Sequence, residues 1–224
     1  MRIDILTLFP EMFTPLKTSI IGRAENSGKV NINVIDIREY TLDKHKKCDD
    51  APFGGGAGMV MMAQPIASAI QAIDSDHQAR RIYLSPKGKK LNQNAVLEYA
   101  ECERLLLLCG HYEGVDQRVL DLFIDEELSL GDFVLKGGEI PAMALTDAVC
   151  RYVSGVINRQ SLEQESFSDG LLEYPQYTRP QEFMGLSVPA VLTSGNHGEI
   201  EKWRKQKSLE ITKKLRPDLI KEEK

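Results

Sequence analysis

The sequence predicts an α/β protein with a mostly parallel sheet covered by helices on both faces, followed by a small helical domain. Short apolar runs alternate with helical segments through the first two-thirds of the chain, which is typical of such a sheet. After Val156 the sequence shows no sustained period, and helical spacing returns near Asn196. We therefore expect one domain at residues 1–157, a flexible linker at 158–172 and a mainly helical domain at 173–224.

Strands are expected where short apolar runs are bounded by turn residues. These runs are Arg2–Leu8, Val30–Ile37, Arg81–Leu84, Leu105–Cys109 and the shorter Phe133–Leu135. Helices are expected between them, where apolar residues recur every three to four positions. These segments are Gln64–Ile73, Asn92–Ala100, Asp116–Phe123 and Ile140–Val153. In a sheet of this kind the functional loops follow the carboxyl ends of the strands.

The helix of the second domain is expected to begin at Asn196, a good capping residue with Glu199 three residues later. From Glu201 to Arg216 the sequence holds seven basic residues and two acidic ones. The basic residues are Lys202, Arg204, Lys205, Lys207, Lys213, Lys214 and Arg216. Such a segment is either a solvated helix face or a nucleic-acid contact, and taken alone it favours the solvated face.

The composition indicates a protein with a sizeable core that does not cross a membrane. Lys and Arg total 28 against 33 Asp and Glu, so the net charge is −5, and 42% of the residues are hydrophobic. The apolar run Leu105–Cys109 is the longest, far short of the roughly 18 residues of a membrane helix. Asp4 and Pro10 interrupt the N-terminal run too early for a secretion signal, and the four cysteines form no C-x-x-C pair. We expect a reducing, cytoplasmic location.

Common phosphate, metal and hydrolase motifs do not occur in the sequence. The glycine run Gly54–Gly58 matches neither the dinucleotide-binding nor the P-loop pattern. The four histidines have no metal-ligand spacing, and no serine-hydrolase elbow occurs. The sequence therefore gives no motif evidence for dinucleotide or P-loop phosphate binding, for a histidine metal site or for a serine hydrolase.

Three polar loops that contain glycine each follow an apolar run, at Leu84–Gly88, Cys109–Asp116 and Leu130–Pro141. Glycine lets backbone N–H and C=O groups approach a ligand closely. One such loop is as often an ordinary turn, but three at one end of a sheet predict a pocket. Because few cations accompany them, we expect a neutral or zwitterionic, nucleoside-like ligand and not a polyphosphate. A longer loop, Asp43–Met59, is expected to touch a substrate, and residues 59–62 are expected in the core.

The chain resembles the bacterial tRNA (guanine-N1)-methyltransferases of the SPOUT superfamily in several motifs taken together. These motifs are Leu130–Pro141, Asp43–Met62, Gly110–Gly114 and Tyr177–Pro180, and the likeness extends from Leu8–Phe13 to Ser194–His197 and Trp203–Arg204. The resemblance implies methyl transfer from S-adenosylmethionine to N1 of the guanine at position 37 of tRNA, 3′ of the anticodon. It also implies a trefoil knot in the C-terminal part of the α/β domain, and a homodimer whose active site is shared between subunits.

By the resemblance, the methyl donor lies in the glycine loops. Backbone groups of Gly110 and of residues 130–135 hold its adenine and ribose, and Glu113 is the partner of its amino group. The residues implied in donor binding are Gly110, Leu130, Gly131, Asp132, Phe133, Val134, Leu135, Tyr83, Leu84, Ser85, Pro86, Tyr112, Glu113, Gly114, Gly137, Gly138 and Pro141.

Methylation of guanine N1 requires a base, because that nitrogen carries a proton, and a cation that stabilises negative charge on O6. The family has an Asp before a Ser-Phe pair at this place, whereas this chain has Glu165 before Ser166 and Phe167. We expect Glu165 to act as the base, with nearby Asp169 as the alternative. Without the family resemblance, the sequence around these two residues indicates carboxylates in a solvated loop. The resemblance assigns Arg151 to the guanine O6, where the pattern alone indicates a helix C-terminal charge.

The RNA contacts implied by the resemblance involve the second domain. The target guanine has to leave its stack to be reached, and the basic helix face from Lys202 to Arg216 becomes a candidate for salt-sensitive contact with the anticodon stem. The predicted RNA-binding residues are Lys202, Arg204, Lys205, Lys207 and Arg179. Mg²⁺ is implied as an aid to catalysis, but no compact carboxylate cluster identifies its ligands. A SPOUT methyltransferase with another RNA target, or a non-catalytic RNA-binding relative, remains the alternative.

Overall fold

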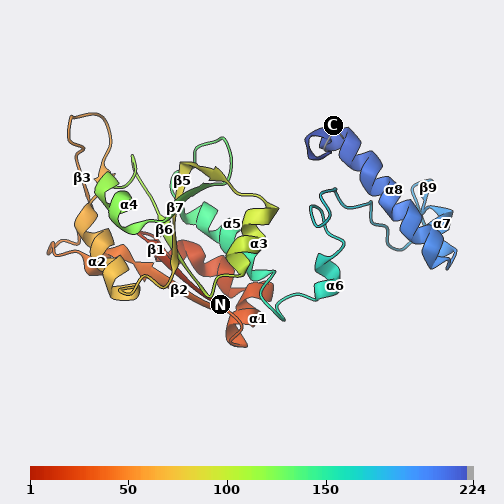
Figure 1. The fold of residues 1–224 in the computed structure, drawn as a ribbon, viewed down its shortest axis with the longest axis horizontal. Coiled ribbons are helices and arrows are strands. Elements are labelled where there is room, and N and C mark those ends of the chain that lie inside the picture. The colour runs from red at the N-terminus through yellow and green to blue at the C-terminus, as the bar shows by residue number, and fades with distance from the viewer. Residues whose placement is uncertain (221–224) are drawn as a thin grey trace. The chain divides into compact units, whose positions relative to one another are not determined.

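The structure, a computed structural model, describes residues 1–220, apart from the side chains of residues 159 and 160. The last four residues of the domain predicted at 173–224 therefore lie outside the described residues. The chain forms two compact units, one of Met1–Ile157 and one that begins at Asn158, and Figure 1 draws the elements of each. Each unit is described by itself below.

The first unit is built on a five-stranded sheet in the order β2-β1-β6-β5-β7. The strands are β1 (Arg2–Thr7), β2 (Asn31–Asp36), β5 (Arg80–Lys90), β6 (Arg104–Cys109) and β7 (Glu126–Ser129). Every neighbouring pair in this sheet is parallel, which confirms the prediction of a parallel α/β sheet. A separate two-stranded hairpin joins β3 (Asp49–Asp50) to β4 (Val60–Met61).

Helices cover both faces of this sheet, as predicted. One face packs against the 3₁₀ segment η1 (Pro10–Lys17) and against α1 (Ser19–Asn26), α3 (Gln93–Ala100) and α5 (Glu139–Cys150). The other packs against η2 (Ile37–Tyr40), α2 (Ala63–Ile73) and α4 (Gln117–Phe123). Successive strand residues supply the two cores in turn, so that Leu105 and Leu107 face one layer while Leu106 and Leu108 face the other. Met61 is fully buried in the second core.

The predicted strand at Phe133–Leu135 is wrong. These residues lie in the irregular loop after β7, and the Val134 side chain is 84% exposed. The three apolar residues lie between Gly131 and the pair Gly137-Gly138. They have the composition of a short strand, but within the described residues they do not pair with a neighbouring strand. The strand that is present, β7, was not predicted because its sequence begins with two glutamates and offers only Leu128 as a buried apolar residue.

The strand β5 is longer than the predicted run and carries an irregularity. Leu84 and Lys89 both pair with Leu128 of β7, so residues 85–88 bulge out of the sheet between them. Gly88 crowds the backbone of Glu127 and Leu128 there. The bulge presents the first predicted loop at the edge of the sheet.

A largely buried ionic network connects strands β1, β5 and β6 with the end of α2. Asp4 on β1 accepts a hydrogen bond from Arg104 on β6 at 2.8 Å, and Arg104 also lies 3.2 Å from Asp74 after α2. Asp74 accepts a second hydrogen bond, from Arg81 on β5, at 2.8 Å. Each carboxylate thus has a charged donor, which a buried charge requires.

The second unit contains several short elements and one long helix. They are α6 (Arg159–Leu162), the hairpin of β8 (Glu182–Phe183) with β9 (Leu186–Ser187), α7 (Ala190–Thr193), α8 (His197–Leu215) and the 3₁₀ turn η3 (Pro217–Leu219). The Asn196 side chain accepts a hydrogen bond from the backbone N–H of Glu199 at 3.3 Å, which confirms the predicted cap of α8. In the part of the chain that the structure describes, no helix has both the length and the apolar character needed to span a membrane.

Candidate functional site

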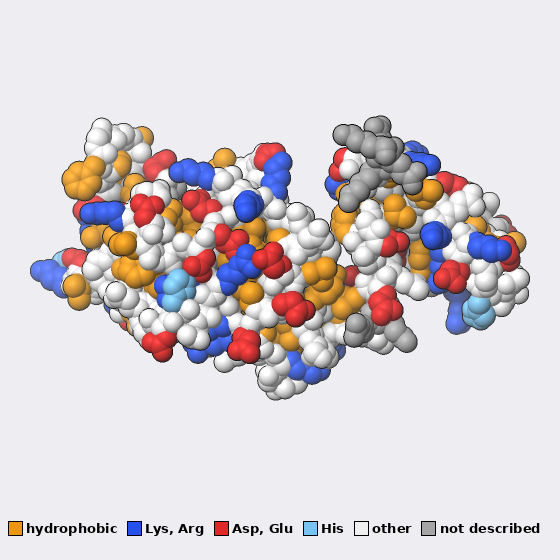
Figure 2. Space-filling model, viewed as in Figure 1, with side chains coloured by type: hydrophobic (Ala, Val, Ile, Leu, Met, Phe, Trp, Pro, Cys, Tyr) orange, Lys and Arg blue, Asp and Glu red, His pale blue; other side chains and the backbone are white. Residues whose placement is uncertain are grey.

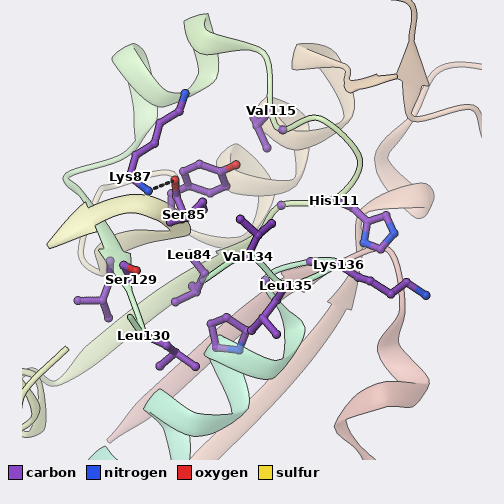
Figure 3. Close-up of a pocket in the computed structure, with 18 of the residues that line it drawn as sticks. Leu84, Ser85, Lys87, His111, Val115, Ser129, Leu130, Val134, Leu135 and Lys136 are labelled. Atoms are coloured by element: carbon purple, nitrogen blue, oxygen red, sulfur yellow. Dashed lines mark hydrogen bonds between the residues drawn. The ribbon is translucent and has the colours of Figure 1, made fainter. Parts of the chain in front are cut away.

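A cavity of about 270 Å³ lies at the carboxyl ends of β5 and β6 (Figure 3). Its walls come from the bulge of β5, from the loop at 110–117 after β6, and from residues 128–138 at the end of β7 and beyond. In the view of Figure 3, Val134 and Leu135 project between Ser85 on one side and His111 on the other. The three loops expected to form a pocket therefore form one, at the strand ends where α/β proteins bind ligands.

The residues predicted to bind the methyl donor all line this cavity except Asp132. Asp132 instead forms an ion pair with Lys90, and both side chains are exposed. The fold thus gathers the predicted residues around one space. Donor binding by them stays a prediction.

The cavity has further lining residues outside the predicted set. They are Lys87, His111, Val115, Gln117, Leu120, Leu128, Ser129 and Lys136. Lys87, His111, Val115 and Lys136 lie inside the three glycine loops, so including every residue of each loop in the predicted site would have found them. Leu128 and Ser129 belong to β7, whose apolar pattern gave no signal.

Two of the loops join at a seam of close backbone contacts. The N–H of Gly138 donates to the carbonyl of Gly110 at 2.8 Å, and His111 forms an isolated antiparallel bridge with Gly137. A Cβ on Gly138 would lie 2.7 Å from the Cα of Cys109, and a Cβ on Gly110 would lie 2.6 Å from the hydroxyl of Tyr83. Glycine is needed at this seam because a Cβ at either position would collide with neighbouring protein atoms.

The long loop that was expected to touch a substrate runs up to the cavity wall. The N–H of Glu113 donates to the carbonyl of Met59 at 2.9 Å, and the N–H of Met61 donates to the carbonyl of Gly114 at 2.9 Å. A Cβ on Gly58 would lie 2.5 Å from the Glu113 side chain. The end of this loop therefore fixes the backbone that carries Glu113.

A buried carboxylate supports the seam from below. Glu139, the first residue of α5, is 2% exposed and accepts a hydrogen bond from the Thr7 hydroxyl at 2.9 Å. Its second oxygen lies 3.9 Å from Nδ1 of His111, and the His111 ring packs at 4.8 Å from the Phe9 ring. The end of β1, the loop after β6 and the start of α5 are thus connected at one point.

Tyr83 and the neighbouring Cys109 both stay protonated around neutral pH. Burial, with a smaller contribution from Glu127, raises the pKa of Tyr83 to about 12, so its phenol stays protonated. Burial also raises the pKa of the Cys109 thiol well above its ordinary value, and Glu139 adds to the effect. Cys109 is not among the residues that line the cavity, and the protonated phenol of Tyr83, which does line it, is a poor nucleophile.

Of the three residues predicted for catalysis, Arg151 belongs to the first unit and does not line this cavity. Arg151 is the C-cap residue of α5 and lines a different groove of the first unit, together with Ile20, Ile140 and Asp147. Glu165 and Asp169 belong to the second unit, and their geometry is described within it.

The segment around Glu165 is held by a local turn. Ser168 donates to the Glu165 carbonyl through both its N–H, at 3.2 Å, and its hydroxyl, at 2.7 Å. Phe167 has a φ of 75° and donates its N–H to Leu171 at 2.7 Å. The Asp169 carboxylate accepts the N–H of Leu171 at 3.2 Å. The backbone that presents both candidate bases is therefore hydrogen-bonded.

Comparison with known proteins identifies the family. The family model described as tRNA (Guanine-1)-methyltransferase TrmD matches residues 1–222, which is nearly the whole chain. This chain belongs to the tRNA (guanine-1)-methyltransferase family. The match includes every loop of the cavity described above.

Curated proteins of this family are similar over nearly their whole length. A protein of Clostridium botulinum (strain 657 / Type Ba4), named tRNA (guanine-N(1)-)-methyltransferase, is 57% identical over 222 residues, 99% of this chain and 92% of the relative. A protein of the same name from Geobacter sulfurreducens is 54% identical over 98% of this chain and 91% of its own length. A third, from Clostridium acetobutylicum, is 54% identical with the same coverage.

The basic residues predicted for RNA contact do not form a single face. At 3.6 residues per turn, Lys202 and Lys205 lie on one side of α8, whereas Arg204 and Lys207 lie on another. Lys202 pairs with Glu199 at 2.9 Å. Figure 2 shows acidic and basic side chains interspersed on this unit. The basic residues therefore lie on two sides of α8, and Arg179 is exposed outside this helix. Contact of these residues with RNA stays a prediction.

A magnesium site of protein ligands is not formed by the described residues. Within residues 1–220, no group of three or more His, Cys, Asp or Glu side chains is arranged to hold a metal ion. Mg²⁺ binds oxygen ligands in a demanding octahedral geometry, and this chain does not assemble such a set there.

Proposed function

We propose that this chain transfers the methyl group of S-adenosylmethionine to N1 of the guanine at position 37 of tRNA, on the 3′ side of the anticodon. The observation that carries the proposal is the family match, which spans residues 1–222 and so includes all the loops of the cavity. Two of the relatives described above, named tRNA (guanine-N(1)-)-methyltransferase, are more than half identical to this chain.

The donor binds in the cavity between the glycine loops. The backbone of Gly110 and of residues 130–135 holds its adenine and ribose, and the carboxylate of Glu113 pairs with its amino group. The lining of the cavity supports this placement, since Gly110, Glu113 and most of residues 130–135 contribute to its walls. When bound, S-adenosylmethionine supplies an electrophilic methyl group on a positively charged sulfur.

The chain's own residues prepare the guanine for attack. Glu165 accepts the N1 proton, and Arg151 stabilises the negative charge that moves onto O6 as that proton leaves. Asp169 is the alternative base.

The active site is shared between two subunits of a homodimer. Gly138 at the start of α5 lines the donor cavity, whereas Arg151 follows its end, and a helix of 12 residues is roughly 18 Å long. That separation is too large for one chain's Arg151 to reach its own donor loops. The groove that contains Arg151 includes the exposed apolar residues Ile20 and Ile140, which suit a subunit contact.

The remaining architecture follows the same family. We propose that the chain around the cavity is knotted as a trefoil, as the family resemblance implies. Residues 158–172 act as the linker, and the segment from 173 binds the anticodon arm of the tRNA. The enzyme acts in the cytoplasm, where its tRNA substrate is found.

The direct test compares two tRNA transcripts that differ only at position 37. Purified protein is incubated with radiolabelled S-adenosylmethionine and a transcript carrying either guanine or adenine there. Label in the guanine transcript alone is the expected result. Label in both transcripts would indicate another RNA target, and donor binding without label would indicate a non-catalytic RNA-binding protein.

Subunit mixing tests the shared site. Arg151→Ala impairs one half of the site and Glu113→Ala impairs the other, so each homodimer is expected to be nearly inactive. A mixture that has exchanged subunits contains heterodimers with one intact site and recovers part of the activity. Recovery no greater than the sum of the two separate proteins would contradict a shared site.

A further inference from the structure

The second unit carries an aromatic cleft of about 480 Å³ that the proposed reaction does not use. One wall comes from the irregular segment before α8, through Pro175, Tyr177 and Pro189. The other wall is a stripe of α8 whose spacing keeps its residues on one side of the helix. This stripe consists of Trp203, Lys207, Glu210, Ile211 and Lys214.

The aromatic rings of this cleft are open to a ligand. The centroids of Tyr177 and Trp203 are 6.4 Å apart with an interplanar angle of 55°, and Tyr177 is 49% exposed. Rings tilted in this way leave room for a flat molecule to stack on one ring while its edge meets the other. Tyr177 is exposed and Trp203 is partly buried, so a ligand stacked in the cleft would remove apolar area of the Tyr177 ring from water.

Neighbouring contacts hold this platform in place. The guanidinium of Arg204 lies 4.7 Å from the centre of the Tyr174 ring, and the N–H of Leu172 donates to the Thr212 hydroxyl at 2.8 Å. Both contacts bind the segment before Tyr177 to α8. The cleft is therefore preorganised, which lowers the entropic cost of binding.

The charges at the cleft divide it into a region for a base and a region for a phosphate. Lys207 pairs with Glu210 at 2.6 Å, and hydrogen bonds from Lys207 and Gln206 lower the pKa of Glu210, which therefore stays ionised at neutral pH. A phosphate is repelled from this carboxylate. Lys214, at the same cleft, has no ion pair with any residue of 1–220 and is available to a phosphate.

We propose that this cleft binds an unstacked nucleobase of the tRNA, outside the methylation target, with Lys214 on an adjoining phosphate. The inference rests on the proposed function for the identity of the RNA. Aromatic platforms flanked by cations are the usual way in which proteins hold unstacked bases, and this part of the chain is basic although the whole chain is acidic. Arg204 and Lys207 then contribute by shaping the cleft, and not as a continuous basic face.

The chain's single tryptophan gives a direct readout of this contact. Full-length protein is titrated with the guanine-37 transcript while Trp203 emission and filter retention of the RNA are followed in parallel. Stacking of a base on Trp203 is expected to quench its emission, with the same midpoint as RNA retention. RNA retention with unchanged emission would overturn the proposal.

Matched variants separate the cleft from general effects. Tyr177→Leu is expected to weaken RNA binding roughly 5- to 100-fold, Tyr177→Phe to restore most of the affinity, and Phe183→Leu, an exposed aromatic outside the cleft, to change nothing. Lys214→Ala is expected to reduce the salt dependence of binding by about one phosphate contact, and Lys213→Ala to leave it unchanged. Wild-type binding by Tyr177→Leu would overturn the proposal.

Methyl transfer measured in the same samples distinguishes two failures. Transfer to guanine 37 without quenching of Trp203 refutes the cleft but leaves the proposed reaction standing. If the protein neither binds nor methylates the transcript, the proposed function and the cleft assignment fail together. Quenching of Trp203 by an unrelated peptide but not by RNA would assign the cleft to a protein partner instead.

Discussion

At the scale of single residues, the donor cavity depends on places where the backbone has no room for a side chain. Gly138 has a φ of −80°, which any residue adopts, so conformational freedom does not explain the glycine there. The explanation is distance, because a Cβ would meet the Cα of Cys109 at 2.7 Å and the amide nitrogen of Gly110 at 2.9 Å. Both atoms belong to the backbone and cannot rotate away.

Gly138→Ala is expected to destabilise the protein by about 1–3 kcal/mol and to weaken S-adenosylmethionine binding, because the backbone at the seam must move apart to make room for the alanine side chain. Calorimetric titration with the donor and thermal unfolding measure the two effects. Gly198→Ala in α8 is the control, since its Cβ meets nothing nearer than Asn196 Oδ1 at 3.6 Å. Equal donor affinity for Gly138→Ala and wild type would show that the seam is not part of the donor site.

Glu165→Gln is expected to slow methyl transfer by about 10²- to 10⁴-fold without changing donor affinity, because the amide cannot accept the N1 proton. Asp169→Asn is expected to have a smaller effect. Single-turnover rates with saturating tRNA measure both, and Glu165→Asp is expected to keep most of the activity. A larger loss in Asp169→Asn than in Glu165→Gln would transfer the role of base to Asp169.

At the scale of elements, helix starts follow local side-chain chemistry. Asn92 accepts the N–H of Ala95 at 3.0 Å and caps α3, Asp116 accepts the N–H of Arg118 at 3.0 Å at the start of α4, and Asn196 caps α8. Each satisfies an N–H that the first turn of a helix leaves without an intrahelical partner. Capping is local in sequence, which is why Asn196 predicted the start of α8 to within a residue.

Asn92→Ala is expected to destabilise the first unit by about 0.5–2 kcal/mol through loss of the cap of α3. For a chain of this size that corresponds to a fall in melting temperature of roughly 1–8 °C. Asn94→Ala, an exposed substitution inside the first turn of the same helix, is the matched control and is expected to be neutral or slightly stabilising. Equal melting temperatures for the two variants would show that the cap contributes nothing.

At the scale of the whole first unit, the buried network of Asp4, Asp74, Arg81 and Arg104 connects strands that are far apart in sequence. Burial opposes ionisation of Asp74, but hydrogen bonds from Arg81 and from the N–H groups of Gln78 and Ala79 outweigh it. The pKa of Asp74 therefore lies below its ordinary value of 3.8. Its charged form is the one that stabilises the fold.

Asp74→Asn is expected to destabilise the first unit by about 3–5 kcal/mol at pH 7, because it removes the carboxylate partner of buried Arg81 and one of the two carboxylate partners of Arg104. Since folding lowers the pKa of Asp74, its stabilisation is present above about pH 4 and is lost as the pH falls through the lower, folded value. Melting temperatures from pH 7 to pH 3 should therefore show the gap between wild type and Asp74→Asn narrowing below pH 4. Glu101→Gln, an exposed carboxylate, is the control, and a gap that stays constant with pH would contradict this role.

The sequence by itself determined the features that depend on neighbouring residues. Apolar runs such as Leu105–Cys109 predicted strands, caps such as Asn196 predicted helix starts, and glycine loops after strands predicted the pocket. It failed at Phe133–Leu135 and at β7, because a short apolar run is bound to the sheet only if a neighbouring strand is there to pair with it. The presence of that neighbouring strand depends on residues far away in the sequence.

Only the tertiary structure decided which distant groups meet. It paired Gly110 with Gly138, placed the end of the Asp43–Met59 loop against Glu113, and gathered Asp4, Asp74 and Arg104 under the sheet. It also placed Tyr177 beside Trp203 and distributed the basic residues around α8. The physical reason is that periodicity and capping act within a few residues, whereas strand order, close packing and charge pairing are satisfied only when the whole chain has folded.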